Sequence, residues 1–151
     1  MEIERKYLIS ELPPHLENYS CRHIEQGYLN TDPVVRIRRE DENYYLTYKS
    51  KGLMVRQEYN LPLSAEAYEH LCPKTDGYLI AKTRYLIPLD ERHTAELDVF
   101  HGDLAPLLLA EVEFATEEEA NAFVPPEWFG TDVTFSTDYH NSTLSQRGLP
   151  D

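Results

Sequence analysis

The alternation in Glu2-Ile3-Glu4-Arg5-Lys6, at the start of the chain, constrains the fold more than any other stretch. Successive side chains of a β-strand point to opposite faces, so Glu2, Glu4 and Lys6 share one face of a strand here. Same-face neighbours lie roughly 6.6 Å apart, which lets two carboxylates reach one divalent cation while the ammonium reaches a neighbouring anion. Taken alone, the pattern is also typical of a solvated edge strand. Its meaning therefore depends on whether later strands repeat it.

The later segments do repeat it, in short strands with tight connections. β-Favouring residues and turn signals predict strands over 2–9, 21–30, 34–40, 44–50, 53–61, 78–89, 94–100 and 107–114. Ser64 is the predicted N-cap of a helix over 65–71, and Thr116 begins a capping box for a helix to about Phe123. Asp138 is the predicted N-cap of a last helix through Gln146. Eight strands joined in this way are typical of an antiparallel meander.

Charged residues of both signs gather on one face of these strands. The chain has 14 Lys and Arg and 27 Asp and Glu, a net charge of −13. Seven of each sign alternate along the predicted strands, so this face is neutral and the remaining seven bases and twenty acids carry the −13. The bases are Lys6, Arg36, Arg38, Lys49, Arg56, Lys82 and Arg84, and the acids are Glu2, Glu4, Glu58, Glu96, Asp98, Glu111 and Glu113.

A sheet of this composition predicts an α+β fold built on a closed eight-stranded antiparallel β-barrel, because closure removes the sheet edges. The charged face then points inward, and the three helices cover parts of the outer wall. Inward charges cost desolvation free energy unless they are paired, hydrated or neutralised by a ligand. Arginine and lysine suit phosphate oxygens, and carboxylates suit Mg²⁺ or Mn²⁺. We therefore expect a polyanion and a divalent cation inside the barrel.

Length and composition limit the number of domains, the kinds of binding partner and the cellular location that we expect. The length of 151 residues predicts a single domain over 1–151. The strongly acidic balance disfavours nucleic acid and anionic membranes as partners. The sequence has no apolar run of about 18 residues and no basic, apolar leader at its start, so we expect a cytoplasmic protein, monomeric or homodimeric. Cys21 and Cys72 lack a nearby partner and are expected to be ordinary thiols.

At this point the ordered motifs resemble a known family. They are the E-x-E-x-K start, Gln26-Gly27-Tyr28-Leu29, the Arg36-x-Arg38 strand, Lys49, Glu58, Lys82-Thr83-Arg84-Tyr85, the segment from Glu96 to Phe100 and the segment from Glu111 to Phe114. In this order they resemble the CYTH, or triphosphate tunnel metalloenzyme, superfamily. The resemblance implies a closed eight-stranded tunnel that binds a small-molecule triphosphate with a divalent metal, Mg²⁺ or Mn²⁺.

The resemblance also implies residue roles. The metal-facing acids are Glu2, Glu4, Glu111 and Glu113; the triphosphate cradle is Lys6, Arg36, Arg38, Lys49, Lys82 and Arg84; and Glu58, Glu96 and Asp98 hold a second cation or orient the bases. The catalytic candidates are Tyr28, which aligns with a tyrosine assigned as a proton acceptor, and Lys82. Tyr28 is alternatively a strand tyrosine that packs at the tunnel mouth.

The leading hypothesis for function is metal-dependent hydrolysis of a linear triphosphate, with inorganic tripolyphosphate as the first substrate to test. Three alternatives stay open: a class IV adenylyl cyclase making cyclic AMP from ATP, a non-catalytic protein that binds polyphosphate or nucleotides, and a structural barrel whose inner charges pair with one another. The segment Asp138 to Ser142 departs from the family pattern, with His140 where tyrosine is usual. The sequence therefore leaves open how the terminal helix caps the tunnel.

Overall fold

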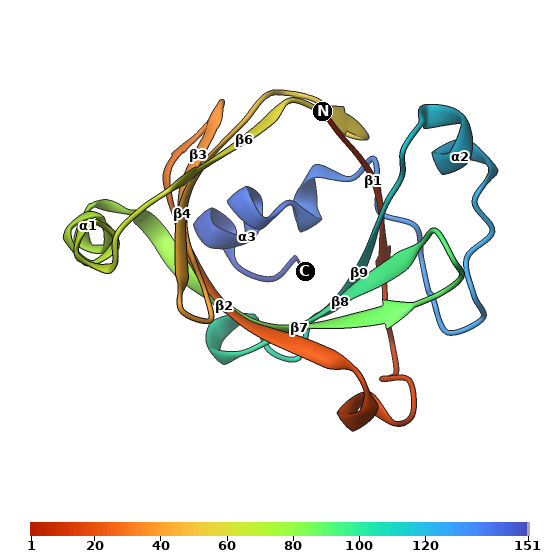
Figure 1. Cartoon of the computed structure of the whole chain (residues 1–151). Helices are drawn as coiled ribbons and strands as arrows, with labels where there is room; N and C mark the ends of the chain where they lie inside the picture. Colours follow the sequence, from red (N-terminus) through yellow and green to blue (C-terminus); the bar gives the residue numbers. More distant parts are fainter. Residues whose placement is uncertain (151) are drawn as a thin grey trace.

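The computed structural model describes residues 1–150, which form a nine-stranded antiparallel sheet curled into a barrel (Figure 1). Along the sheet the strand order is β5-β1-β9-β8-β7-β2-β3-β4-β6. The strands are β1 (Glu2–Leu8), β2 (Ser20–Thr31), β3 (Val34–Glu40), β4 (Asn43–Lys49), β5 (Val55–Arg56), β6 (Glu58–Pro62), β7 (Asp76–Pro88), β8 (Thr94–Phe100) and β9 (Leu108–Glu113). The helices are α1 (Ala65–Leu71), α2 (Glu117–Ala122) and α3 (Asn141–Arg147), with 3-10 turns at Leu16–Asn18, Cys72–Lys74, Gly102–Leu104 and Thr137–Tyr139. The predicted antiparallel barrel is confirmed.

The strand count is nine rather than the predicted eight because the strand predicted over 53–61 is divided. β5 pairs with β1, and β6 pairs with β4. Only Gln57 separates β5 from β6, so one short chain segment hydrogen bonds to the first and the last strand of the main sheet. The segment changes partners as it crosses from one edge to the other, and the barrel closes through it.

The prediction for the C-terminal helix was wrong at its start. Ser136 Oγ accepts a hydrogen bond from the Asp138 backbone N–H, and this bond caps the 3-10 turn Thr137–Tyr139 instead of an α-helix. His140 is extended, with φ −64° and ψ 138°, so α3 begins only at the next residue. The predicted stop is confirmed, since Gly148 ends the helix with φ 73°. The Ser64 and Thr116 caps are also confirmed, each accepting from a backbone N–H three residues on.

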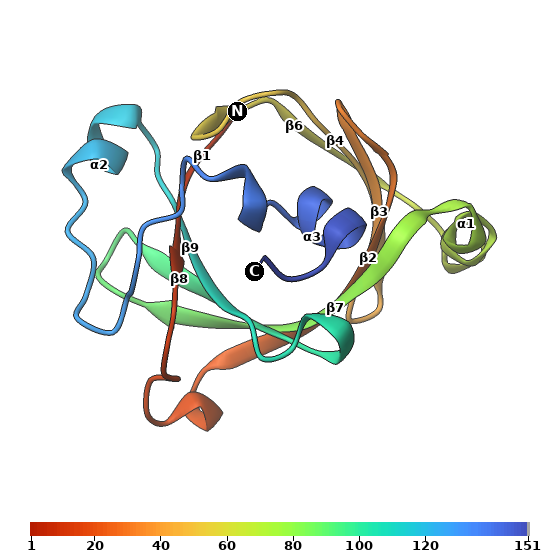
Figure 2. The same cartoon turned by 180° about the vertical axis from the view of Figure 1, so that it is seen from behind.

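Two apolar clusters lie on opposite sides of the barrel wall. The outer cluster packs under α2 and comprises Tyr7, Ile9, Ile87, Ala95, Leu97, Ala110, Val112, Phe114, Ala120 and Phe129. The inner cluster comprises Tyr28, Val34, Ile80, Phe100, Leu104, Leu109, Val133 and Leu144. Leu144 belongs to α3, so this helix lies within the ring of strands (Figures 1 and 2). The expectation that all three helices cover the outer wall was therefore wrong for α3.

None of the helices formed by residues 1–150 has the length and apolar character needed to cross a bilayer.

Candidate active site inside the barrel

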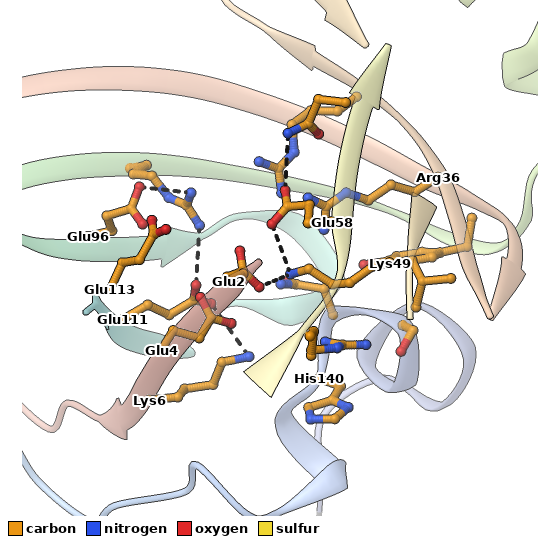
Figure 3. A pocket seen from close by; sticks show the side chains of 18 of the residues that line it. Glu2, Glu4, Lys6, Arg36, Lys49, Glu58, Glu96, Glu111, Glu113 and His140 are labelled. Atoms are coloured by element: carbon orange, nitrogen blue, oxygen red, sulfur yellow. Dashed lines mark hydrogen bonds and ion pairs between the residues drawn. The ribbon is translucent and has the colours of Figure 1, made fainter. Parts of the chain in front are cut away.

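A charged cavity of about 350 Å³ lies inside the barrel, on the N-terminal side of α3 (Figure 3). Its lining comes from the inward positions of the strands and from the segment that enters α3. The lining residues are Met1, Glu2, Glu4, Lys6, Tyr28, Val34, Arg36, Arg38, Lys49, Arg56, Glu58, Asn60, Arg84, Glu96, Glu111, Glu113, His140, Asn141 and Ser142. The structure thus brings together most of the residues predicted from the alternation, and their roles stay predictions.

Register between β1, β9 and β8 builds an acidic wall on one side of this cavity. Glu4 lies opposite Glu113, and Glu111 lies opposite both Lys6 on β1 and Glu96 on β8. Directly opposite residues of neighbouring strands point to the same face. Carboxylates from three adjacent strands therefore stand side by side, with few bases between them. We call Glu2, Glu4, Glu96, Glu111 and Glu113 the acidic wall (Figure 3).

Burial and neighbouring like charges raise the pKa of Glu4 and Glu2, whereas Lys6 and then Arg84 outweigh burial and hold the pKa of Glu111 well below its usual range. Burial, and then the charge of Glu111, raises the pKa of Glu4 to about 8. Burial, and then the neighbouring Glu58, raises the pKa of Glu2 to about 7. Lys49 Nζ lies 2.7 Å from Glu2 Oε1, yet the contact is an ion pair without hydrogen-bond geometry and this buried oxygen keeps an unfilled acceptor position. Glu4 and Glu2 therefore hold protons near neutral pH at a place where a cation would be favourable.

The donor chemistry of the acidic wall fits a hard divalent cation that binds together with phosphate. Within residues 1–150 no three His, Cys, Asp or Glu side chains already converge at metal-ligating spacing. Mg²⁺ usually takes one or two carboxylates and completes its shell with water and substrate phosphates, so it does not require such a cluster. The acids of β1 and β9 are thus suited to a shared metal rather than to a closed protein cage.

Across the cavity from most of these acids, β3 and β4 form a basic wall made by Arg36, Arg38 and Lys49. Figure 3 shows Arg36 and Lys49 on this side. Arg56 of β5 also lines the cavity, but it is paired with Glu2 of β1 and lies beside the acids. Burial, and then repulsion from Arg36 and Arg84, lowers the pKa of Arg38 to about 10. Arg36 Nε is buried without a hydrogen-bond acceptor among residues 1–150. A buried donor without an acceptor costs free energy, and clustered guanidinium groups are the protein's usual way to bind phosphate. The basic wall is therefore suited to a polyanion.

Lys6, Lys49 and Arg84 pair with acids that line the cavity. Lys6 Nζ lies 3.5 Å from Glu111 Oε1 and donates to the Tyr139 carbonyl at 3.2 Å. Lys49 Nζ lies 3.9 Å from Glu58 Oε2, in addition to its contact with Glu2. Arg84 Nη1 donates to Glu96 Oε2 at 3.1 Å. Because both contacts of Lys6 are long, this base can turn toward an anion without leaving a short hydrogen bond.

Lys82 and Asp98 lie one layer behind the cavity surface. They are not among its lining residues within the described chain, and their side chains are 0% and 1% exposed. Lys82 Nζ contacts Asp98 Oδ2 at 2.8 Å, and Arg84 binds both carboxylate oxygens of Asp98 at 2.8 and 2.9 Å. Burial lowers the pKa of Lys82 to about 7, outweighing Asp98. Burial would raise the pKa of Asp98, but Arg84 and then Lys82 lower it. The pair supports Arg84 from behind.

Tyr28 lines the cavity, and the Gln26 side-chain amide donates to its hydroxyl at 3.3 Å. The phenol is therefore held in the wall, and its predicted role as proton acceptor remains a prediction.

Sequence reasoning gave no role to Arg56, Asn60, His140, Asn141 or Ser142, all of which line the cavity. Arg56 was on the predicted charged face, and Asn60 continues the alternation two residues after Glu58. The alternation along the strands could therefore have predicted that both residues line the cavity. The other three carry no such signal, because nothing in their spacing shows that the last helix lies inside the barrel. Burial, and then Lys6 and Arg56, lowers the pKa of His140 to about 4, so an uncharged imidazole lines this end.

Comparisons with known proteins agree with this geometry. The family model for the CYTH domain matches residues 1–146. An inorganic triphosphatase of Nitrosomonas europaea is 42% identical over 147 residues, covering 95% of this chain and 96% of that protein. An inorganic triphosphatase of Acetivibrio thermocellus is 34% identical over 150 residues, covering 95% and 92%. A crystal structure of an inorganic triphosphatase superimposes with a TM-score of 0.75 at 39% identity, covering 99% of this chain and 97% of that one.

A more distant structural neighbour shares the fold alone. It is an adenylyl cyclase candidate from Hippeastrum with a dominant triphosphatase activity, and it superimposes with a TM-score of 0.64 at 15% identity, covering 81% of this chain and 83% of that one.

Proposed function

The chain belongs to the CYTH domain family, and we propose that it is a metal-dependent triphosphatase that hydrolyses a linear triphosphate, inorganic tripolyphosphate first, to pyrophosphate and phosphate. One observation carries the proposal: an acidic wall and a basic wall line a single cavity, and burial with like charges raises the pKa of Glu4 in the first and lowers that of Arg38 in the second. A polyanion on the basic wall and a divalent cation on the acidic wall relieve the repulsion in both walls at once. The two triphosphatase relatives support this assignment.

The basic residues bind and polarise the phosphate chain. Arg36, Arg38 and Lys49 of the basic wall contact its non-bridging oxygens from one side. Lys6 of β1 and Arg84 of β7 contact them from the side of the acids. Charge on these oxygens changes as the terminal P–O bond breaks, and preorganised cations in a site with little water stabilise that change.

Glu2, Glu4, Glu111 and Glu113 are the proposed ligands of the metal, which when bound, as Mg²⁺ or Mn²⁺, neutralises and aligns the phosphates. Glu58 orients Lys49, and Glu96 orients Arg84, through the ion pairs already described. Asp98, which is paired with Lys82, fixes Arg84 from behind. Tyr28 is the proposed acceptor of the proton of the attacking water.

Phosphate release from tripolyphosphate, thiamine triphosphate and ATP, with Mg²⁺, with Mn²⁺ and with a chelator, tests the proposal. Arg38→Ala is compared with Arg39→Ala, because Arg39 is exposed on the outer face of the same strand and binds the Asp41 carbonyl instead. Loss of a charged hydrogen bond to substrate predicts a fall in kcat/KM of about 10- to 100-fold for the first variant, and little change for the second.

Two outcomes contradict the proposal. Turnover that persists in the chelator removes the metal from the mechanism. Cyclic AMP as the main product from ATP, with no phosphate released from any of the three substrates, identifies a cyclase in place of a hydrolase.

A further inference from the structure

Asn141 stands between a fully buried lysine and the cavity. Its side-chain Oδ1 accepts a hydrogen bond from Lys82 Nζ at 3.4 Å. Lys82 is 0% exposed and is not part of the cavity lining within residues 1–150, whereas Asn141 is half-buried and lines the cavity directly. Lys82 therefore reaches the cavity through the amide of Asn141.

The charge of Lys82 fixes which way this amide points. Lys82 Nζ lies 2.8 Å from the Asp98 carboxylate, which favours the ammonium form. An ammonium group can only donate hydrogen bonds, so the atom of Asn141 that faces it is the carbonyl oxygen. The oxygen and nitrogen of an amide are assigned from such partners, and here only one assignment is compatible with the lysine. Nδ2 must then point the other way. Within residues 1–150 this nitrogen donates no hydrogen bond, and it is accessible to solvent rather than buried.

Lys82 is itself held firmly, which makes the amide a preorganised donor. Asp98 Oδ2 contacts its ammonium at 2.8 Å, and the Phe100 ring lies 5.3 Å from Nζ. The aliphatic stem cannot move outward without separating Nζ from Asp98 in a water-poor layer. The lysine thus polarises the amide and holds it in one orientation.

We propose that Asn141 is a substrate-binding residue whose Nδ2–H donates to a non-bridging phosphate oxygen of the triphosphate. This inference rests on the proposed function for the identity of the anion. It gives Lys82 an indirect role, because the lysine acts on substrate through Asn141. It also explains why the terminal segment enters the barrel beside the cavity: residue 141 supplies a neutral donor on a side where the strands supply charged groups.

A purely structural role makes a different prediction. If Asn141 served only to hold Lys82, then Asn141→Asp would be the mildest substitution, because a carboxylate accepts from an ammonium more strongly than an amide does. If Nδ2 donates to phosphate, the same substitution replaces the donor with an anionic oxygen facing an anionic substrate. Asn141→Leu has similar size and removes both interactions without adding repulsion. The order of the two variants therefore separates the roles.

The experiment measures the affinity for inorganic tripolyphosphate by calorimetry in a chelator, where no turnover is expected, and then KM and kcat with Mg²⁺. Gln146→Ala, an exposed position on the same helix, is the control. Our expectation is a Kd about tenfold weaker for Asn141→Leu and about a hundredfold weaker for Asn141→Asp, with KM raised in the same order. Thermal unfolding of each variant confirms that it folds, and because Asp can pair with Lys82, that variant is expected to be at least as stable as the wild type.

Each outcome decides the question. An Asn141→Asp affinity equal to or better than that of Asn141→Leu overturns the inference. A wild type that binds tripolyphosphate without hydrolysing it refutes the proposed function, yet leaves the ratio of the two variants to decide Asn141. A wild type that neither binds tripolyphosphate in the chelator nor hydrolyses it with Mg²⁺ overturns both.

Discussion

Removing one negative charge from the acidic wall should stabilise the metal-free protein while damaging its activity. Glu4 is the best position, because burial and then Glu111 raise its pKa from 4.5 to about 8. A carboxyl whose pKa is higher in the folded state contributes stability that is complete below about pH 4.5 and is lost as pH rises toward 8. The unfolding free energy of the wild type should therefore fall across this range on account of Glu4.

The size of the effect follows from the shift. One pKa unit corresponds to about 1.4 kcal/mol, so between pH 5 and pH 7.5 Glu4 lowers the unfolding free energy by about 3 kcal/mol. Glu4→Gln keeps the shape of the protonated acid and cannot ionise. Between pH 5 and pH 7.5 we expect the unfolding free energy of this variant to fall by about 3 kcal/mol less than that of the wild type. Because Glu4 is also a proposed metal ligand, kcat/KM with Mg²⁺ should fall.

Urea denaturation at pH 5 and pH 7.5 in a chelator measures the difference. Glu113→Gln is the matched control for stability, since Glu113 belongs to the same wall but is exposed, and surface changes usually stay within about 0.5 kcal/mol. Adding Mg²⁺ with tripolyphosphate should stabilise the wild type more than Glu4→Gln. If the unfolding free energies of the wild type and of Glu4→Gln changed equally between pH 5 and pH 7.5 in the chelator, the reasoning would be refuted.

Two further predictions concern the outside of the barrel. Arg5→Ala removes hydrogen bonds from the guanidinium to backbone carbonyls at and after α2 and to Asp132, so urea denaturation should show a loss of about 2 kcal/mol with phosphate release unchanged; loss of turnover at full folding would contradict this. A hydrogen bond to Asp90, and then one to Glu119, raises the pKa of His93, so its contribution is complete below about pH 6.5 and is lost as pH rises through the folded value. His93→Gln should therefore lower Tm more at pH 6 than at pH 8.5, and an equal loss at both would count against the pairing.

The strand alternation predicted the inward residues because a period of two is the same in every strand. Glu4, Arg38 and Glu111 face the cavity for this reason, although they come from strands far apart in the sequence. Depth is a different matter. Lys82 points to the same face of β7 as Arg84 but lies behind the cavity surface, because α3 covers the part of the barrel interior where Lys82 lies. Alternation along a strand shows which face a side chain is on, and it does not show how far along the barrel axis the side chain lies.

The closing segment and the last helix were also beyond the sequence pattern. The break at Gln57 reflects the need to pair with both β1 and β4, which depends on the curvature of the whole sheet. The position of α3 depends on the inner apolar cluster around Leu144, whose members come from both halves of the chain. Local residue preferences do not report such long-range contacts, so the role of Asn141 emerges only from the structure.

A diffraction experiment on crystals grown with Mn²⁺ and a bridging-nitrogen analogue of tripolyphosphate tests the central claim most directly, because the anomalous signal locates the metal. The account predicts one Mn²⁺ bound by acids of β1 and β9 and by the phosphate chain, with that chain against Arg36 and Arg38. A metal or phosphate chain located outside the cavity, or a chain bound with the metal remote from the acidic wall, would contradict it.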